Sequence, residues 1–201
     1  MLNKTILSVD WRLVNLNLIP SDFIELPHGR LRGELKLSHG HSYGLVGPNG
    51  IGKSSLIRWC KLNLLENIAY LDQSRLRPLV NLKVQEVIRL LEIELKARPA
   101  KLIEFFEFEN LLDRKVNELS GGENQLLKII LTFSLDRDWY FLDEPFLNLS
   151  ESNREKVIEL IQNLKKERKS FLIIEHHKDL LDQLVENVFV IEGEAGDYHV
   201  R

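Results

Sequence analysis

The chain has 201 residues, of which 44% are hydrophobic and 28% are charged, and its 27 basic and 30 acidic residues give a net charge of −3. This balance excludes a strongly basic surface, so composition gives no reason to expect direct binding to nucleic acid or to an anionic membrane. The single cysteine, Cys60, excludes an intramolecular disulfide and agrees with a reducing cytosol.

The sequence also predicts neither a membrane span nor a secretion signal. No apolar run approaches the ~18 residues of a transmembrane helix. The first residues, "MLNKTILSVDWRLVNL", are interrupted by Asp10 and Arg12 and lack the layout of a signal peptide. We therefore expect an intracellular protein of one domain, long enough to bury a real core.

The first third of the chain predicts strands followed by one helix. Residues 5–19 and 31–38 have strand-like composition, and "HSYGLVG" at 41–47 is a short apolar strand after a turn at Gly40. A helix is expected from Lys53 to about Asn63. A further strand, "NIAYLDQ", follows at 67–73.

The rest of the chain predicts mainly helices, broken by buried strands. Val84, Val87, Ile88, Leu91 and Leu95 have helical spacing within 82–97, and 101–114 continues helically after Pro99. Ser152 and Glu155 suggest a capping box for a helix over 151–169. The other expected elements are a helix from 125 to 133, strands at 138–144, 170–176 and 188–194, and a short helix at 178–187.

This order of elements predicts an α/β fold. Strands that alternate with helices favour a mostly parallel sheet covered on both faces. Residues 78–118 contain helical patterns only, so we expect them to form an inserted helical subdomain. Residues 1–77 and 119–201 would then form the catalytic core of a single domain, 1–201.

A phosphate-binding loop is predicted at residues 47–55. "GPNGIGKSS" matches G-x-x-x-x-G-K-[ST] between a strand and a helix, and a chance match is expected on the order of 10⁻² times in a chain of this length. Its glycines let backbone N–H groups surround phosphate oxygens. Lys53 would reach the β- and γ-phosphates, and Ser54 would bind Mg²⁺. The loop comprises Gly47, Pro48, Asn49, Gly50, Ile51, Gly52, Lys53, Ser54 and Ser55.

Polar side chains follow three of the expected strands. Asp143 and Glu144 end the apolar strand "WYFLDE", where a buried pair of carboxylates needs a reason. Beside a phosphate loop, Asp143 would bind the Mg²⁺ cluster and Glu144 would polarise the attacking water. Gln73 would contact the metal or the water. His176 would hydrogen-bond the γ-phosphate. The alternative for the acidic pair is a strand end that opens into solvent.

Five motifs in this order, "GPNGIGKSS", "YLDQ", "LSGGE", "WYFLDEP" and "IIEHH", resemble the nucleotide-binding domain of the ATP-binding cassette superfamily. They span residues 47–177. The resemblance implies a P-loop NTPase (RecA-like) core with a mostly parallel sheet, a reduced N-terminal antiparallel β subdomain and an inserted helical subdomain. It implies ATP and Mg²⁺ as cofactors and ATP hydrolysis as the activity.

The resemblance also explains a pair of glycines at the start of a buried helix, where glycine costs roughly 0.8–1.0 kcal/mol relative to alanine. Ser120, Gly121, Gly122 and Glu123 would cap the γ-phosphate of an ATP held by a second cassette domain. Two such domains, identical or paralogous, would pack head to tail around two ATP molecules. The alternative is a glycine pair that serves only packing.

Three departures from the family pattern stand out. Lys53 and Gln73 are only 20 residues apart, about half the usual spacing, so the β subdomain would be trimmed. Ser150 replaces an aspartate that normally links the two sites. No tyrosine occupies the adenine-stacking position, for which Phe23 is the first substitute and His28 the second; Phe23 is as compatible with ordinary core packing.

For partners, the resemblance favours separate transmembrane permease subunits that dock on the helical subdomain. The protein would then be cytoplasmic, and peripheral on the cytoplasmic face of the inner or plasma membrane through those subunits. No direct contact with nucleic acid is expected. The alternative is a soluble ATP switch that acts on ribosomes or another non-transport partner, since the spellings "YLDQ" and "LSGGE" also resemble that branch.

Overall fold

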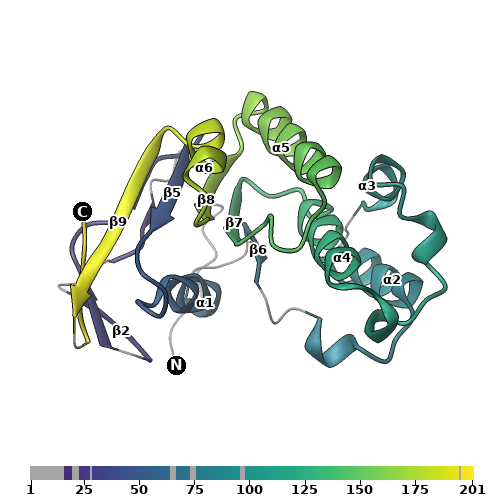
Figure 1. The fold of residues 1–201 in the computed structure, drawn as a ribbon, viewed down its shortest axis with the longest axis horizontal. Coiled ribbons are helices and arrows are strands. Elements are labelled where there is room, and N and C mark those ends of the chain that lie inside the picture. Colours follow the sequence, from purple (N-terminus) through teal and green to yellow (C-terminus); the bar gives the residue numbers. More distant parts are fainter. Residues whose placement is uncertain are drawn as a thin grey trace, which may run out of the picture.

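The computed structural model describes residues 16–19, 23–27, 29–63, 67–72, 76–95, 98–194 and 196–201. Among these residues, eight strands form one curled sheet in the order β2-β3-β10-β9-β5-β8-β7-β6 (Figure 1). The parallel part consists of β9 (Asn187–Glu194), β5 (Ser42–Val46), β8 (Ser170–Ile174), β7 (Trp139–Asp143) and β6 (Ile68–Leu71). The predicted α/β fold with a mostly parallel sheet is confirmed.

Among the described strands, antiparallel pairing is found near the two termini. β2 (Phe23–Leu26) pairs with β3 (Gly29–Arg32), β10 (Asp197–Val200) pairs with β9, and β1 (Leu16–Asn17) pairs with β4 (Lys36–Leu37). The single strand expected over 31–38 is wrong. It is divided at Gly33, whose φ of +107° turns the chain away from β3. Of the strand expected over 5–19, residues 5–15 lie outside the described residues.

The sheet separates two hydrophobic clusters, and β7 contributes side chains to both. Trp139 and Phe141 point to the cluster that contains Leu56 of α1 (Lys53–Asn63). Tyr140 and Leu142 point to the opposite cluster, which contains Leu127 of α4 (Gly121–Phe133). This two-residue alternation, with every residue of β7 buried, explains why the strand is apolar throughout.

Between β6 and α4 the described residues form helices and 3-10 turns. They are η2 (Arg77–Leu79), α2 (Val84–Leu95), α3 (Ala100–Phe105), η3 (Glu109–Leu111) and η4 (Val116–Glu118). Val84, Val87, Phe108 and Val116 are buried in the same cluster as α4, so α4 joins this helical lobe, on the right in Figure 1, to the sheet. The helix expected over 101–114 ends at Phe105, because Glu107 is left-handed with φ of +56°.

The cap of α5 (Glu151–Lys166) differs from the sequence prediction. The N-cap is Ser150, whose Oγ accepts a hydrogen bond from the N–H of Asn153 at 3.3 Å. The expected capping box of Ser152 and Glu155 is therefore wrong, because both residues lie inside the first turns. The helix also ends at Lys166 rather than at 169, because Arg168 has a left-handed backbone with φ of +63°.

The strand order places three loops side by side. β5, β8 and β7 are parallel neighbours, so their carboxyl ends meet at one edge of the sheet. These ends lead into the loop at 47–52, into Glu175 and His176, and into Glu144. Ligands of open α/β sheets bind at such edges. Among the described residues, no helix has the length and apolar character that crossing a membrane requires.

Candidate functional site

The loop after β5 has the backbone conformation of a phosphate cradle. Gly47, Gly50 and Gly52 have φ of +155°, +79° and +105°, values that other residues rarely adopt. A Cβ on Gly47 would lie 2.6 Å from the carbonyl oxygen of Ile191, whereas a Cβ on Gly50 would meet nothing within 4 Å. The first glycine is therefore required by packing, and the second leaves open space. Ile51 is buried in the core, so only its backbone faces the loop interior.

Lys53 is the buried cation of the loop. The residue is only 6% exposed, and its Nζ donates hydrogen bonds to the carbonyl oxygens of Gly47 at 2.7 Å and Pro48 at 2.9 Å. Burial lowers the pKa of the Lys53 ammonium, and the carboxylates of Glu144 and Asp143 oppose that shift. The ammonium thus sits folded back on its own loop, beside two acids.

Ser54 and Asp143 form a pair of oxygen donors. The hydroxyl of Ser54 donates to Oδ1 of Asp143 at 3.1 Å, which joins the start of α1 to the end of β7. Asp143 is 4% exposed, and burial raises the pKa of its carboxyl group; the hydrogen bond from Ser54 acts against this rise. A cation at this position would therefore relieve an unfavourable burial of charge.

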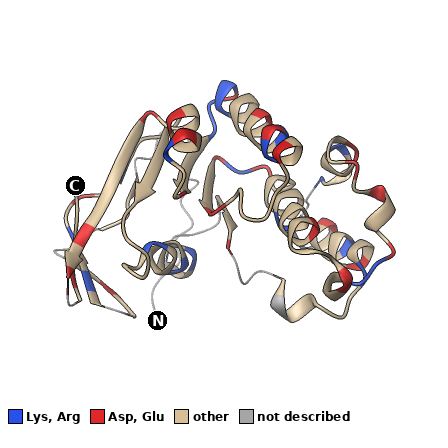
Figure 2. Cartoon of the chain, in the orientation of Figure 1, with Lys and Arg blue, Asp and Glu red and all other residues tan. Residues whose placement is uncertain are grey.

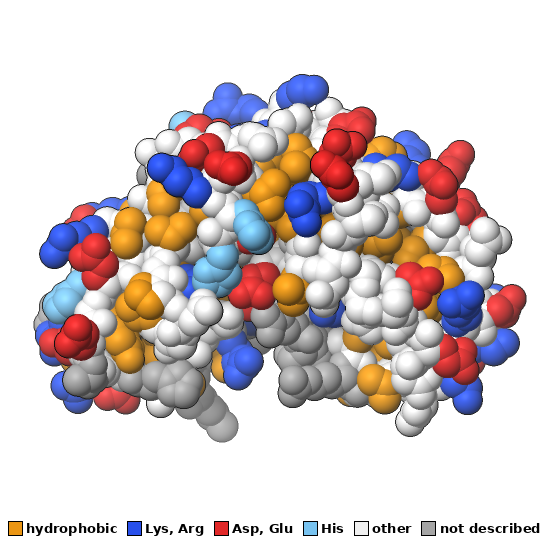
Figure 3. Space-filling view, in the orientation of Figure 1, with side chains coloured by type: hydrophobic (Ala, Val, Ile, Leu, Met, Phe, Trp, Pro, Cys, Tyr) orange, Lys and Arg blue, Asp and Glu red, His pale blue; other side chains and the backbone are white. Residues whose placement is uncertain are grey.

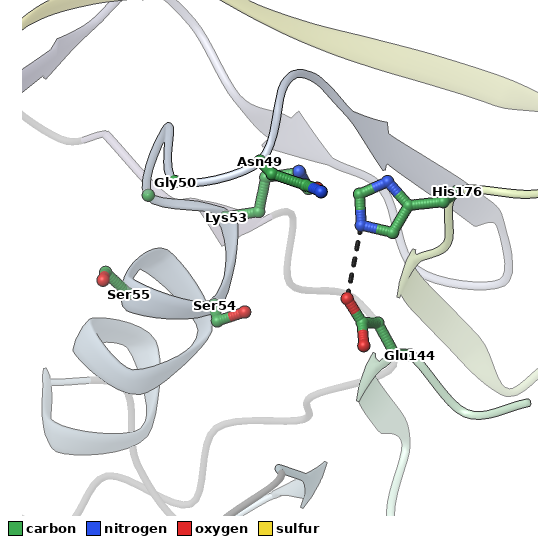
Figure 4. Close-up of a pocket in the computed structure, with 8 residues that line it drawn as sticks. Asn49, Gly50, Lys53, Ser54, Ser55, Glu144 and His176 are labelled. Atoms are coloured by element: carbon green, nitrogen blue, oxygen red, sulfur yellow. Dashed lines mark ion pairs between the residues drawn. The ribbon is translucent and has the colours of Figure 1, made fainter. Parts of the chain in front are cut away.

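Glu144 and His176 face each other across the two strand ends. His176 Nε2 lies 3.2 Å from Glu144 Oε1 (Figure 4). Glu144 has a left-handed backbone with φ of +49°, and its N–H donates to the carbonyl oxygen of Ile174 at 3.0 Å. Backbone strain of this kind gathers at functional sites.

These groups surround one open cavity of about 400 Å³, lined by Asn49, Gly50, Gly52, Lys53, Ser54, Ser55, Glu144 and His176. In Figure 4 the loop and α1 form one wall, and Glu144 and His176 form the other. Figure 3 shows histidine side chains beside acidic ones at the centre of this face of the molecule. Most of the residues predicted around a triphosphate thus lie together.

Ser120, Gly121, Gly122 and Glu123 lie outside this cavity. Ser120 caps α4, accepting a hydrogen bond from the N–H of Glu123 at 3.3 Å, while Glu123 Oε2 accepts one from the N–H of Ser120 at 2.7 Å. The carboxylate of Glu123 is therefore used by a capping box. Ser120 and Gly121 are exposed, and Gly122 is half-buried. The α4 N-terminus is accessible to another molecule rather than to this chain's own cavity.

The two glycines of the α4 N-terminus have different surroundings. A Cβ on Gly122 would lie 2.8 Å from the backbone oxygen of Asn148, which excludes any side chain there. A Cβ on Gly121 would lie 3.3 Å from the side-chain Nδ2 of Asn148, an exposed group that can move. Packing within this chain therefore requires glycine at position 122, whereas it does not require glycine at position 121.

The predicted glutamine and the two candidates for adenine stacking remain to be placed. Gln73 and His28 lie outside the described residues. Phe23, at the start of β2, does not line the cavity. The guanidinium groups of Arg30 and Arg32 lie 4.6 Å and 5.6 Å from its ring centroid. Its stacking on adenine stays a prediction, with those two arginines as its neighbours.

The structure adds three polar residues to the region that the sequence prediction missed. Buried Gln125 of α4 donates from Nε2 to the carbonyl oxygens of Glu144 and Pro145, both at 3.1 Å. Buried Glu175 accepts hydrogen bonds from the N–H groups of His176 and His177. Arg154 lines a neighbouring cavity of about 200 Å³ with Glu144 and His176. Only the presence of Gln125 in an otherwise apolar helix face gave a signal in the sequence.

Comparison with known proteins gives one consistent family. A family model described as "ABC transporter" matches residues 60–147. The "Uncharacterized ABC transporter ATP-binding protein MJ0719" of Methanocaldococcus jannaschii is 28% identical over 178 residues, covering 80% of this chain and 29% of that protein. The "Translation initiation factor rli1" of Schizosaccharomyces pombe is 30% identical over 159 residues, covering 75% of this chain and 26% of that protein.

A solved structure agrees over almost the whole chain. An archaeal ribosome recycling factor, aABCE1, in complex with the ribosomal stalk protein aP1, is 28% identical, with a TM-score of 0.75, covering 98% of this chain and 41% of that one. The chain therefore spans between a quarter and two fifths of the proteins named here.

Proposed function

The chain is a nucleotide-binding domain of the ATP-binding cassette superfamily, and from this premise we propose that it is an ATP-driven switch. ATP would pair two such domains head to tail, and hydrolysis would release them. The observation that carries the proposal is the division of the site: one chain gathers most of the phosphate loop, Glu144 and His176 around one cavity, with Asp143 bonded to Ser54 of its lining, but leaves its own α4 N-terminus outside it.

The loop at 47–55 fits a triphosphate. Its open side is at Gly50, where even a Cβ would meet nothing. Lys53 donates to carbonyl oxygens of its own loop, and phosphate oxygens would be stronger acceptors for a buried ammonium. α1 begins at Lys53 and presents its positive helix end to the same space.

The donor set fits Mg²⁺. The hydroxyl of Ser54 and the carboxylate of Asp143 are hard oxygen donors, which Mg²⁺ prefers, and it completes its shell with phosphate oxygens and water. Within the described ranges, no three acidic, histidine or cysteine side chains gather to hold a metal alone, which agrees with an ion bound together with nucleotide. When bound, it would neutralise charge that develops on the phosphates.

Glu144 is the proposed general base. Its carboxylate borders the cavity opposite Lys53, where it would accept a proton from the attacking water. His176 would hold the carboxylate of Glu144 in place through its Nε2, 3.2 Å away, and hydrogen-bond the γ-phosphate. Gln73, whose position the structure does not describe, completes the proposed set of catalytic residues.

The second half of the site would come from the other domain. Ser120 and Gly121 are exposed at the first turn of a 13-residue helix, so they can approach a phosphate that another chain holds. This arrangement is isologous in a homodimer, so both sites would be equal.

Substitution of the proposed base tests the switch. Glu144→Gln removes the proton acceptor but keeps the shape of the side chain, so ATP should bind and remain uncleaved, and a dimer should accumulate. Light scattering at saturating ATP and Mg²⁺ measures it, with ADP as the control. A Glu144→Gln protein that stays monomeric with ATP would refute the pairing.

For the partner, we propose membrane subunits of a transporter that dock on the helical subdomain, residues 78–118. The family description and the printed name of the Methanocaldococcus relative support this. So do two apolar side chains on the outside of α2, Leu90 at 43% and Ile93 at 74% exposure, since exposed apolar groups three residues apart share one helix face. The protein would then lie on the cytoplasmic face of the membrane.

Ribosomes are the second candidate partner. The rli1 relative and the aABCE1 structure, whose names concern translation and ribosome recycling, align with 75% and 98% of this chain. Affinity purification of the tagged chain from its own cells separates the two. Co-purified multi-span membrane proteins support transport, and ribosomal proteins with rRNA support the second candidate.

A further inference from the structure

Gln125 connects the α4 N-terminus to the backbone of the proposed base. The side chain is 4% exposed, one turn beyond the capped start of α4. Its single amide nitrogen donates to two consecutive carbonyl oxygens, those of Glu144 and Pro145, each at 3.1 Å. Both N–H donors of this buried amide bond to the same loop. The side chain is therefore held to that loop, because leaving either buried donor unpaired would cost free energy.

Lys128 determines which way the Gln125 amide faces. Its Nζ donates to Oε1 of Gln125 at 3.2 Å, three residues away on the same helix. An ammonium can only donate, so it requires the amide oxygen on its own side and turns the amide nitrogen toward the loop. Asp72, at the end of β6, acts electrostatically on the same ammonium, and Lys61 of α1 contacts Asp72 at 2.7 Å.

The loop that Gln125 holds is strained. Glu144 and Asn148 are both left-handed, with φ of +49° and +60°, which costs energy for residues other than glycine. The N–H of Leu147 donates to the carbonyl oxygen of Glu144 at 3.2 Å, so that one oxygen accepts from both the loop and Gln125. Without the amide, the left-handed conformation of Glu144 loses its support from α4.

We propose that Gln125, oriented by Lys128, is a positioning residue that transmits a shift of α4 to the carboxylate of Glu144. The inference rests on the proposed function, because the shift would arise when the α4 N-terminus meets the ATP of the partner domain. Each domain would then align its own base only when its own helix start is engaged. Hydrolysis would thereby be confined to the paired state, and an isolated domain would conserve its ATP.

The decisive variant is Gln125→Glu, which keeps the size of the side chain but replaces the donating nitrogen by an oxygen that faces two carbonyl oxygens. Lys128 remains beside it to balance the charge. We expect kcat for ATP hydrolysis to fall about tenfold or more with KM little changed, since an interaction needed only for alignment is lost. Lys128→Met should have the same effect in weaker form, because Gln125 can then rotate its amide.

Hydrogen exchange provides a second measurement that does not depend on activity. In Gln125→Glu the amides of residues 144 and 146–149 should exchange faster, that of Leu147 above all, while α1 and the core strands keep their wild-type protection. Mixing in ATP should slow exchange at 144–149 in the wild type and leave it unchanged in the variant.

Matched controls come from the surface of the same chain. Gln183→Glu makes the same change where the amide bonds only within its own helix, to Asp179. Lys166→Met removes an exposed lysine that donates to Asn163 with the same three-residue spacing as Lys128 and Gln125. Both controls should retain wild-type kcat and exchange.

The outcomes separate this inference from the proposed function. Wild-type kcat in Gln125→Glu, or faster exchange throughout the protein instead of at 144–149, would overturn the positioning role. If the wild type itself bound ATP without hydrolysing it, the proposed function would fail, whereas an ATP-dependent change at 144–149 that is lost in Gln125→Glu would still support the link.

Discussion

At the scale of single residues, the site concentrates charge in a buried position, where a charged group is unfavourable. Asp143 is the clearest case, because the residue is 4% exposed and burial raises the pKa of its carboxyl group. The carboxyl group of Asp143 therefore keeps its proton to a higher pH in the folded protein than in the unfolded chain. Stability falls as the pH rises from the unfolded pKa of this group to its folded pKa. Above it, the nucleotide-free fold carries a fixed electrostatic cost.

This cost predicts a stabilising but inactivating substitution. Asp143→Asn removes the buried charge and keeps an oxygen for Ser54, so the nucleotide-free protein should melt at a higher temperature at pH 7, by about 2–4 °C for each kcal/mol recovered. The difference should disappear as pH falls below the ordinary pKa of aspartate, about 3.9. Calorimetry over this pH range checks it, and a lower melting temperature at pH 7 would contradict the pKa argument. Mg²⁺-dependent hydrolysis should be lost.

Lys53 gives the second prediction at this scale. Lys53→Ala should abolish detectable ATP binding by isothermal titration calorimetry, because the cavity loses the one buried cation that borders it among the described residues. The fold should survive, since the hydrogen bonds that Lys53 makes to described residues go to its own loop, at Gly47 and Pro48. Lys166→Met serves as the control for loss of a lysine. Unchanged ATP affinity in Lys53→Ala would refute the assigned loop.

At the scale of elements, the two glycines at the start of α4 have different roles, one in packing and one in leaving the helix start open. The glycine pair predicts a helix start open to a phosphate, with packing as the alternative. The geometry separates the two explanations by position, since Gly122 meets a backbone oxygen at 2.8 Å and Gly121 meets only a movable side chain at 3.3 Å.

The glycines should therefore fail in different ways. Gly122→Ala should destabilise the fold by about 1–3 kcal/mol, a cost typical of overpacking. Gly121→Ala should have nearly the wild-type free energy of unfolding, because its methyl group lies on the exposed side. It should nevertheless lose ATP-dependent pairing. Urea denaturation and light scattering measure the two effects. Equal stability of both variants would contradict the packing argument.

α5 carries the departure at residue 150. Ser150 caps the helix through Asn153, and aspartate is an equally good N-cap whose charge favours the positive helix end. Ser150→Asp should therefore leave stability unchanged or slightly raised, while the Hill coefficient for ATP changes more than the maximal rate. A changed rate with constant cooperativity would remove the assigned role of this loop.

Local pattern was sufficient for the parallel core and for predicting that the loop at 47–55, Glu144 and His176 lie together at its edge. Buried strands such as β7 are apolar along their whole length, and the carboxyl ends of parallel strands meet by topology alone. Pattern failed where the backbone conformation of one residue ends a strand or a helix, as at Gly33 and Glu107. It also failed where a side chain contacts a residue that is distant in the sequence. The contact of Gln125 with the Glu144 loop is of this second kind, because nothing in a helix pattern says which loop the helix will face.

At the scale of the whole molecule, the charges are dispersed. Figure 2 shows, among the residues that it colours, basic and acidic residues interspersed over both the sheet and the helical lobe. Association with a partner would therefore depend on shape, on the nucleotide and on exposed apolar groups rather than on long-range attraction.

Mixing two inactive variants tests the pairing directly. Lys53→Ala lacks a working phosphate loop, and Gly121→Asp lacks a working helix start, so neither alone should hydrolyse ATP. In an equal mixture, half of the dimers combine both chains and hold one intact site of two. Independent sites would give about a quarter of wild-type activity. The proposed link through Gln125 predicts much less, because the chain with the intact phosphate loop carries the disabled helix start. A mixture that stays inactive while mixed dimers form would indicate that both sites must act together. Activity in either variant alone would refute the shared site.

The contact between Gly122 and the oxygen of Asn148 has a consequence for the history of such chains. A lineage that no longer pairs around nucleotide would be released from selection at Gly121, but would remain under selection at Gly122 for as long as it must fold. Descendants in which the second glycine persists and the first has drifted would mark cassettes that kept their architecture after losing their partner.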